Sequence, residues 1–477
     1  MHATMYASRT GSKVLIIYGE APVSSGAANP LGPDYKAFNG VGVLSAAGLR
    51  TFTATSARSA RTALADALAA AELGGAVTLH LPTNVQLAEL APDEIGPRPS
   101  HAVAAPKPVM PRPQAIEAAA AMLAKARTPL IVAGLGAHRA GARAALEKLA
   151  EKTGALLITS ARGKDLFHGH PLDLGILGSF SHSMARRMAD QADCVIVFGA
   201  GLNFLTTSFG TSLPKVPLIQ VDAVRTNIGR WCPADVAVVG DARIAAEQLT
   251  AAVPERPAAE KPFHSEANRK LLAAFDIAQD FQPANTPRTI DPRSLGVELN
   301  KLLPKYRNLV YDAGNFLGIL PYITAPSPAH FKMTNDFASI GLGFGAALGV
   351  AKARPDTPTV LIIGDGGFLM TMGELETVVR EDLPMIIILM NDCAYGAELH
   401  FLKLRQQPVA KSVFPDVDFA PIAAAFGFQA ATIRTLDDLR KMAPVLAKPE
   451  GPIFLDCKIN ADIAAPFMSE FAHAEGH

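Results

Sequence analysis

The chain has 477 residues, of which 49% are hydrophobic and 18% are charged, a composition that fills large cores and excludes a disordered or fibrous protein. Lysine plus arginine and aspartate plus glutamate balance at 44 each, so the chain lacks the positive field that a nucleic-acid or anionic-membrane binder uses. We therefore expect a small-molecule ligand, with neither nucleic acid nor a membrane as a partner.

The four cysteines are scattered along the chain without a C-x-x-C pair, which indicates free thiols in a reducing compartment. The apolar runs fall short of the ~18 residues that a membrane helix requires. The N-terminus lacks an apolar segment followed by a small-residue cleavage site, as a secretory signal would have. We expect a soluble, cytoplasmic protein.

Proline-rich stretches at 92–113 and 253–262 divide the chain into three blocks, 1–95, 112–255 and 288–477, with a surface helix predicted over 264–281. Within each block, short Val/Ile/Leu runs alternate with alanine-rich helical stretches. We expect strands over 13–19, 76–82, 128–136, 155–159, 193–201, 217–222, 308–314, 359–367 and 385–392, and helices over 60–73, 142–154, 341–353 and 372–380. This alternation predicts an α/β fold with three doubly wound parallel-sheet domains, the first of them incomplete.

The middle block contains a possible dinucleotide turn, in which Gly134 and Gly136 follow a strand and precede a helix. The third glycine of the dinucleotide fingerprint would fall at residue 139, which is Arg139. A structural turn is therefore the better interpretation. Asp222 follows another strand and is more typical of a helix cap than of a ribose ligand.

The last block carries a sharper signal at two strand ends. One strand runs into Gly364, Asp365, Gly366 and Gly367, and the next ends before Asp392. Carboxyl ends of parallel strands share one edge of a sheet, where ligands bind. Aspartate oxygens suit Mg²⁺ or Ca²⁺ rather than zinc, and glycines with helix N-terminal amides suit phosphate. The alternative is a glycine-rich turn with a capping aspartate.

The stretch 336–398 resembles the cofactor-binding domain of thiamine-diphosphate enzymes of the acetolactate synthase, pyruvate decarboxylase and benzoylformate decarboxylase family. In this family G-D-G is followed by N-N at the spacing that separates Asp365 from Asp392, which is 27 residues here. Residues 129–178 resemble the central domain of the family. The resemblance implies thiamine diphosphate and Mg²⁺ as cofactors.

The resemblance also implies roles for individual residues. Mg²⁺ would be bound by the side chains of Asp365 and Asp392 and by the backbone carbonyl of Ala394. Asp392 replaces the commoner asparagine, and its added charge should tighten metal binding. The thiamine diphosphate would be bound by Gly314, Asn315, Ala338, Ile340, Gly364, Gly366 and Gly367, with Ile340 wedged between the two rings of the cofactor. Core packing is the alternative for Ile340.

Glu398 matches the acid–base glutamate of the decarboxylases, although an exposed helix glutamate is an equal alternative. His400 is better interpreted as a surface or substrate-pocket residue than as a catalytic one. The family activates its cofactor with a glutamate from an early strand of the first domain. Because residues 13–22 resemble the second half of that domain, we expect this glutamate upstream of Met1, since Glu20, Glu72, Glu89 and Glu94 stand elsewhere. Cofactor activation should then be severely impaired.

Two functions follow from the resemblance. The first is an acetolactate synthase-like lyase or transferase that decarboxylates a 2-keto acid, ligates the resulting enamine to a carbonyl acceptor, or does both. The alternative is a non-catalytic thiamine-diphosphate-binding homologue or partner subunit. A nucleotide-binding protein is a third, weaker interpretation, because the glycine fingerprint of the middle block is broken. In the family the cofactor lies between two subunits, so we expect a homodimer or homotetramer.

Overall fold

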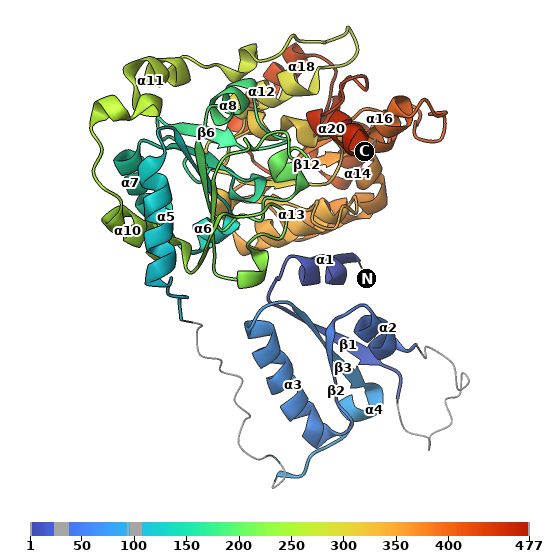
Figure 1. Cartoon of the computed structure of the whole chain (residues 1–477). Coiled ribbons are helices and arrows are strands. Elements are labelled where there is room, and N and C mark those ends of the chain that lie inside the picture. Colours follow the sequence, from blue (N-terminus) through green and yellow to red (C-terminus); the bar gives the residue numbers. More distant parts are fainter. Residues whose placement is uncertain (1, 23–37, 93–94, 96–106, 476–477) are drawn as a thin grey trace. The chain divides into compact units, whose positions relative to one another are not determined.

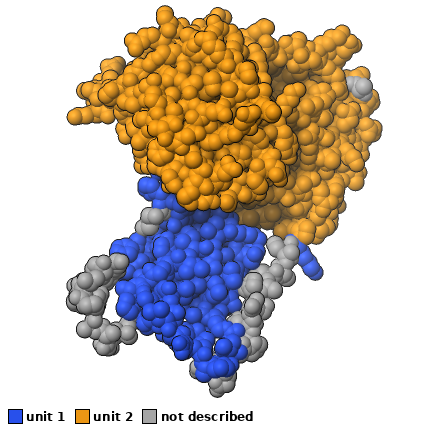
Figure 2. Space-filling view, turned by 180° about the vertical axis from the view of Figure 1, so that it is seen from behind, with its two compact units in different colours: residues 1–107, 334–339 blue, residues 108–333, 340–477 orange. Residues whose placement is uncertain are grey.

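The computed structural model describes residues 2–22, 38–92, 95 and 107–475, and these form two compact units that are coloured separately in Figure 2. Unit 1 comprises Met1–Lys107 with Thr334–Ser339, and unit 2 comprises Pro108–Met333 with Ile340–His477. We describe each unit by itself.

Unit 1 contains a three-stranded parallel sheet with the order β1-β3-β2. Its elements are α1 (His2–Arg9), β1 (Val14–Glu20), α2 (Gly40–Ala46), β2 (Arg50–Thr53), α3 (Ala57–Glu72), β3 (Ala76–Pro82) and α4 (Thr83–Gln86). Ser56 starts α3 with a capping box, because its side chain accepts from the N–H of Ser59 and the Ser59 hydroxyl accepts from the N–H of Ser56.

The first sheet of unit 2 has six parallel strands in the order β6-β5-β4-β7-β8-β9. These strands are β4 (Pro129–Ala133), β5 (Leu156–Thr159), β6 (Asp173–Ile176), β7 (Cys194–Phe198), β8 (Leu218–Asp222) and β9 (Val236–Val239). The helices around them are α5 (Pro113–Lys125), α6 (Leu135–Arg139), α7 (Arg143–Thr153), α8 (Ser183–Ala189), α9 (Phe204–Thr207), α10 (Ala242–Ala252) and α11 (Glu266–Ala273).

Helices cover both faces of this sheet, because successive side chains of a strand point to opposite sides. On β4, Ile131 packs with α5, α7 and α10, whereas Leu130 and Val132 pack with α8 on the other face. Helices α5, α7 and α10 lie together at one side of the sheet in Figure 1. Each continuous apolar strand therefore contributes side chains to the hydrophobic cores on both faces of the sheet.

The second sheet of unit 2 also has six parallel strands, in the order β11-β10-β12-β13-β15-β14. They are β10 (Asn308–Tyr311), β11 (Phe331–Met333), β12 (Thr359–Gly364), β13 (Met385–Asn391), β14 (Gln429–Ile433) and β15 (Ile453–Lys458). The accompanying helices are α12 (Pro292–Leu302), α13 (Leu342–Ala353), α14 (Asp365–Thr371), α15 (Leu375–Arg380), α16 (Gly396–Leu404), α17 (Ala420–Phe426), α18 (Leu436–Lys441), α19 (Ala443–Ala447) and α20 (Pro466–Glu475). These sheets confirm the predicted α/β class with parallel, helix-covered sheets.

The strand order places a topological switch between β10 and β12. From β10 the chain crosses to β11 on one side, and it then returns to β12 on the other. Connections leave such a point in opposite directions and open a crevice beyond the carboxyl ends of the two strands, where ligands bind in open α/β sheets. The turn 312–315 and Gly364 lie at these two strand ends.

The turn at Gly134 and Gly136 packs directly against the backbone at Gly199, so protein atoms occupy the space where a dinucleotide would bind. A Cβ atom on Gly136 would lie 2.7 Å from the Cα of Gly199, and one on Gly134 would overlap the carbonyl oxygen of Gly199. Asp222 caps its own turn, because its carboxylate accepts from the N–H of Val224 at 2.8 Å. Both observations agree with the structural interpretation of these two motifs.

The surface helix expected over 264–281 is shorter in the structure, where α11 ends at Ala273. Asp276 accepts a hydrogen bond from the N–H of Ala278 and begins a separate 3₁₀ turn, while the ring of Phe275 stacks on His182 at 4.5 Å. These contacts lie directly after the end of α11, so the helix does not continue to residue 281.

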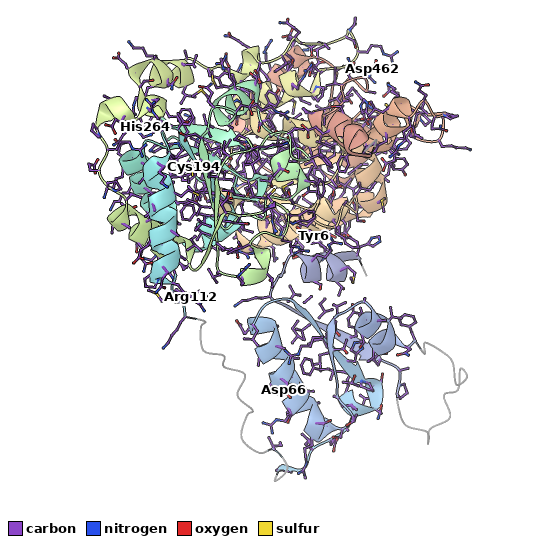
Figure 3. All side chains as sticks on the ribbon, in the orientation of Figure 1. Tyr6, Asp66, Arg112, Cys194, His264 and Asp462 are labelled. Carbon is purple, nitrogen blue, oxygen red and sulfur yellow. The ribbon has the colours of Figure 1, made fainter. Side chains whose placement is uncertain are left out.

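All four cysteines are free thiols, as expected. Cys194, labelled in Figure 3, is buried on β7, and burial raises its pKa to about 12. Within the described part of the chain, every helix is too short or too polar to cross a bilayer.

Candidate functional site

Two aspartates meet at the edge of the second sheet of unit 2. Asp365 is the first residue of α14, directly after β12, and Asp392 follows β13. Strands β12 and β13 are hydrogen-bonded neighbours, which confirms the prediction that the two aspartates follow adjacent strands. Asp365 is 2% exposed and Asp392 is half-buried.

The charges of this pair are not balanced by a salt bridge in the part of the chain that the structure describes. Burial, together with the nearby charge of Asp392, raises the pKa of Asp365 to about 8, and burial raises the pKa of Asp392 to about 7. Among the described residues, neither carboxylate forms an ion pair with a lysine, arginine or histidine. A buried carboxylate and a half-buried one that repel each other form an arrangement that a divalent cation stabilises.

A third oxygen is available beside them. The backbone N–H of Ala394 donates to Oδ2 of Asp365 at 3.2 Å, so this residue lies at the pair. Its carbonyl oxygen accepts no hydrogen bond within the described residues. The described chain contains no cluster of three or more His, Cys, Asp or Glu side chains that could hold a metal, so two carboxylates and a carbonyl form the candidate set. These hard oxygens fit Mg²⁺.

Glycines line the start of α14 because neighbouring groups occupy the space of a side chain. A Cβ atom on Gly366 would lie 2.7 Å from the ring of Tyr395, and one on Gly367 would overlap a carboxylate oxygen of Asp312. A Cβ atom on Gly396 would likewise overlap the Asp392 carboxylate. The backbone therefore comes close to these groups only where there is no side chain.

Asp312, which follows β10, holds the start of α13. Its buried carboxylate accepts from the N–H of Gly341 at 2.6 Å and from the N–H of Gly343 at 2.9 Å. A carboxylate at a helix N-terminus satisfies amides that have no partner inside the helix. This contact fixes α13 next to the crevice between β10 and β12.

Gly314 and Asn315 lie at the same strand end as Asp312, where they were predicted to cradle a diphosphate. A Cβ atom on Gly314 would lie 2.5 Å from the ring of Phe316, which also lies against Gly364. The amide of Asn315 is used elsewhere: it donates to the carbonyl of Ile463 at 2.9 Å and accepts from the N–H of Ala465 at 2.8 Å. Its side chain therefore anchors the segment after β15.

Ile340 is half-buried rather than part of a core, and a Cβ atom on Gly366 would lie 3.6 Å from its Cδ1. It thus faces the glycines of α14, where its predicted wedge would act. Ala338 belongs to unit 1, where it is exposed and adopts a left-handed φ of 56°.

Glu398 is exposed in the first turn of α16, which starts next to the aspartate pair. His400 is buried on the same helix, so it is not a surface residue. Burial lowers its pKa, a hydrogen bond to the carbonyl of Ile463 opposes this effect, and its Nε2 has no partner among the described residues.

The sequence analysis missed a pair in unit 1. Nδ1 of His80 lies 2.5 Å from Oε1 of Glu20, and Nε2 of His80 lies 3.2 Å from the hydroxyl of Thr78. The parallel register, in which Tyr18 faces His80, brings these residues together across 60 positions of sequence. Only the strand pairing could have revealed this contact. Glu94, which the sequence analysis also named, lies outside the described residues.

Two family models match the chain, and together they cover more than half of it. Residues 116–249 match the thiamine pyrophosphate enzyme central domain, and residues 312–457 match the thiamine pyrophosphate enzyme C-terminal TPP binding domain. The second match contains Asp365, Asp392, Ala394 and the glycines of α14.

Two curated relatives are each 28% identical to the chain over the residues that align. A probable acetolactate synthase large subunit of Methanocaldococcus jannaschii is 28% identical over 367 residues, which are 75% of this chain and 61% of the relative. A sulfoacetaldehyde acetyltransferase of Roseovarius nubinhibens is 28% identical over 387 residues, covering 75% of the chain and 64% of the relative. The chain thus spans less than two thirds of the length of these relatives.

Two solved structures share the fold. A putative thiamin diphosphate-dependent enzyme from Mycobacterium smegmatis has a TM-score of 0.73 and 22% identity, with 96% of this chain and 84% of that chain covered. Benzoylformate decarboxylase from Polynucleobacter necessarius has a TM-score of 0.75 and 18% identity, with 97% and 84% covered.

Proposed function

The chain belongs to the thiamine pyrophosphate enzymes, and from this premise we propose that it uses thiamine diphosphate and Mg²⁺ to decarboxylate a 2-keto acid, to ligate the remaining fragment to a carbonyl acceptor, or both. Relatives described as acetolactate synthase and acetyltransferase support this reaction class. When bound, thiamine diphosphate supplies the carbon nucleophile and the electron sink that decarboxylation needs.

One observation carries the proposal: a buried and a half-buried carboxylate, both with raised pKa values, lie at adjacent strand ends, beside glycines whose missing side chains let neighbouring groups come close. Asp365 accepts hydrogen bonds from the N–H groups of Gly366 and Ala394, as a capping aspartate does. The nearby carboxylate of Asp392 argues against a purely structural role for Asp365, because it adds a repulsion that only a cation or a proton relieves.

The residues of the chain would divide the work of binding. Asp365, Asp392 and the Ala394 carbonyl would bind Mg²⁺, whose charge would in turn hold the diphosphate of the cofactor. At the start of α14, the N–H of Gly367 would donate to a phosphate oxygen, and the N–H of Gly366, which donates to Oδ1 of Asp365 at 2.8 Å, would hold that metal ligand beside it. Ile340 would support the cofactor from its position opposite Gly366.

Glu398 would move a proton during the reaction. It lies on α16 within two turns of the metal site, and its exposure leaves its carboxylate free to reach a ligand. A positioned acid–base group typically contributes 10²–10⁴-fold to a rate. Glu398→Gln should therefore lower turnover by about this factor without weakening metal binding.

Calorimetry with thiamine diphosphate and Mg²⁺ tests the binding site. We expect Asp365→Asn to weaken cofactor binding at least tenfold, because a buried charge-assisted ligand is lost. The matched control is Asp437→Asn on α18, whose side chain is 80% exposed and which should bind as the parent does. Equal affinity of Asp365→Asn and the parent would refute the site.

Catalysis is tested separately from binding. The exchange of the reactive-carbon proton of bound thiamine diphosphate with deuterium can be followed by quenched-flow NMR. Acceleration over the free cofactor supports an enzyme, whereas tight binding without acceleration supports the non-catalytic alternative.

A further inference from the structure

Strand β15 carries two charged residues, Asp456 and Lys458, although every residue of the strand is buried. Their side chains are 0% and 2% exposed, and Oδ2 of Asp456 lies 3.2 Å from Nζ of Lys458. The Lys458 ammonium also lies 2.9 Å from Oδ1 of Asp416 and donates to the carbonyl of Val417. A buried ion pair adds little net stability, because the loss of hydration offsets the attraction between the charges. Stability alone therefore does not explain this pair.

The pair contacts the neighbouring strand through Asn391, the last residue of β13, which the strand register places opposite Lys458. Asn391 is 2% exposed, and its Nδ2 donates to Oδ1 of Asp456 at 2.9 Å and to the carbonyl of Val417 at 3.3 Å. The other oxygen of Asp456 is held by Lys458 and by the N–H of Phe419 at 2.9 Å. Because both carboxylate oxygens are engaged as acceptors, the amide of Asn391 has only one favourable orientation, with Nδ2 toward the carboxylate.

This orientation of Asn391 shapes the turn that follows β13. With Nδ2 directed at the carboxylate, Oδ1 faces the turn and accepts from the N–H of Cys393 at 3.2 Å. Cys393 has a left-handed φ of 57°, which a residue with a side chain adopts only where surrounding contacts hold it. The next N–H, that of Ala394, donates to Oδ2 of Asp365 at 3.2 Å. The turn thus brings its two proposed metal ligands to the third.

We propose that the buried pair of Asp456 and Lys458 positions the metal site, by orienting the amide of Asn391 and thereby the turn that presents Asp392 and the Ala394 carbonyl. Lys458 is then a positioning residue, which acts on the metal ligands through Asn391. The inference rests on the proposed function for the identity of the metal, whereas the orientation of the turn does not depend on it.

Loss of the Lys458 ammonium has two opposing effects on metal binding. Lys458→Met keeps a long apolar stem but leaves the carboxylate of Asp456 buried without a cation, so the carboxylate loses one of the groups that orient it. The removal of a positive charge would by itself tighten the binding of a cation. Weaker metal binding therefore identifies the positional effect by its sign.

Binding of Mn²⁺ in the presence of thiamine diphosphate, measured by electron paramagnetic resonance, tests the proposal. We expect Lys458→Met to raise the dissociation constant of Mn²⁺ about 10- to 100-fold, the usual range for groups that orient metal ligands. Lys164→Met is the matched control, because it removes the cation of another buried pair of unit 2, in which Lys164 lies 2.7 Å from Asp165. It should bind Mn²⁺ as the parent does. Unchanged or tighter binding in Lys458→Met would overturn the proposal, as would equal weakening in the control.

A double-mutant cycle tests whether Lys458 acts through Asn391. Asn391→Ala should weaken Mn²⁺ binding with the ion pair intact, and the combination with Lys458→Met should bind no more weakly than Asn391→Ala alone. Additive losses would overturn the route. If Lys458→Met does not fold, Asp456→Asn replaces it: its single acceptor oxygen cannot serve both Asn391 and Lys458, so weaker Mn²⁺ binding is expected and unchanged binding overturns the proposal.

Amide hydrogen exchange of the segment 391–394 in the cofactor-free protein separates this inference from the proposed function. The N–H of Cys393 is protected by Asn391, so it should exchange about tenfold faster in Lys458→Met and at the parental rate in Lys164→Met. If exchange accelerates but the parent does not bind Mn²⁺, the proposed function fails and the orientation of the turn by the ion pair stands. If the parent binds Mn²⁺ and Lys458→Met changes neither exchange nor affinity, the positioning role alone fails.

Discussion

The imidazole of His182 illustrates how a single side chain in this protein is tied to one protonation state. Its Nδ1 accepts from the N–H of Ala185 at 3.1 Å and thereby caps α8, and its ring stacks on Phe275. Burial lowers its pKa to about 4. A protonated ring would present an N–H to the amide of Ala185 and lose the cap.

This coupling predicts acid sensitivity. The pKa of His182 in the folded state is below its unfolded value of about 6.5, so the unfolded chain binds more protons between pH 4 and 6.5, and stability falls as the pH drops through this window. Because unfolding is coupled to protonation of His182, we expect the unfolding free energy of unit 2 to fall by about 2 kcal/mol between pH 7 and pH 5. His182→Asn keeps a capping acceptor and should lose this pH dependence in urea titrations, whereas the exposed control His168→Asn should retain it. An unchanged slope in His182→Asn would contradict the assignment.

At the scale of elements, the start of α13 depends on one carboxylate. Asp312→Ala removes the acceptor of two backbone amides, at Gly341 and Gly343, and should lower the unfolding free energy of unit 2 by about 2–4 kcal/mol. Asp312→Asn keeps one acceptor oxygen, so its unfolding free energy should lie between those of the parent and Asp312→Ala. Urea denaturation measures both, with Asp356→Ala as an exposed control. Loss of stability no greater than in the control would show that α13 is positioned by its apolar face instead.

Strands and their ends were the predictable part of this fold. Continuous apolar runs allow β12 and β13 to be predicted from the local sequence alone. Parallel pairing of these strands then brings Asp365 and Asp392 to one edge of the sheet. Elements governed by long-range contacts were not predictable. The end of α11 depends on the stacking of Phe275 on His182, and the Glu20–His80 contact depends on strand register. The role of Asn315 as an anchor for 463–465 needed the C-terminal segment to be placed first.

At the scale of the whole molecule, α14 exposes an apolar surface beside the candidate site. Leu369 and Met370 are 46% and 57% exposed on this helix, two and three residues after Gly367. Burying such side chains against another subunit would be favourable. We propose that α14 contributes to a homodimer or homotetramer interface.

Light scattering tests this assembly. The parent should have at least twice the 50.2 kDa mass of one chain at micromolar concentration with cofactor present, whereas Met370→Glu should shift the protein toward the monomer. Leu271→Glu on α11, at a side chain that is 40% exposed, is the matched control and should keep the parent's mass. A monomeric parent would refute the proposal.

The aspartate pair has one more consequence, which concerns the solvent rather than the protein. With pKa values of about 8 and about 7, Asp365 and Asp392 together hold on the order of one proton or more at neutral pH, and a metal ion can bind only the ionised carboxylates. Uptake of Mg²⁺ should therefore acidify an unbuffered solution, tighten as the pH rises from 6 to 8, and give a calorimetric heat that varies with the ionisation enthalpy of the buffer. In Asp392→Asn, which removes one acid and the repulsion, this release should become smaller, while burial still raises the pKa of Asp365.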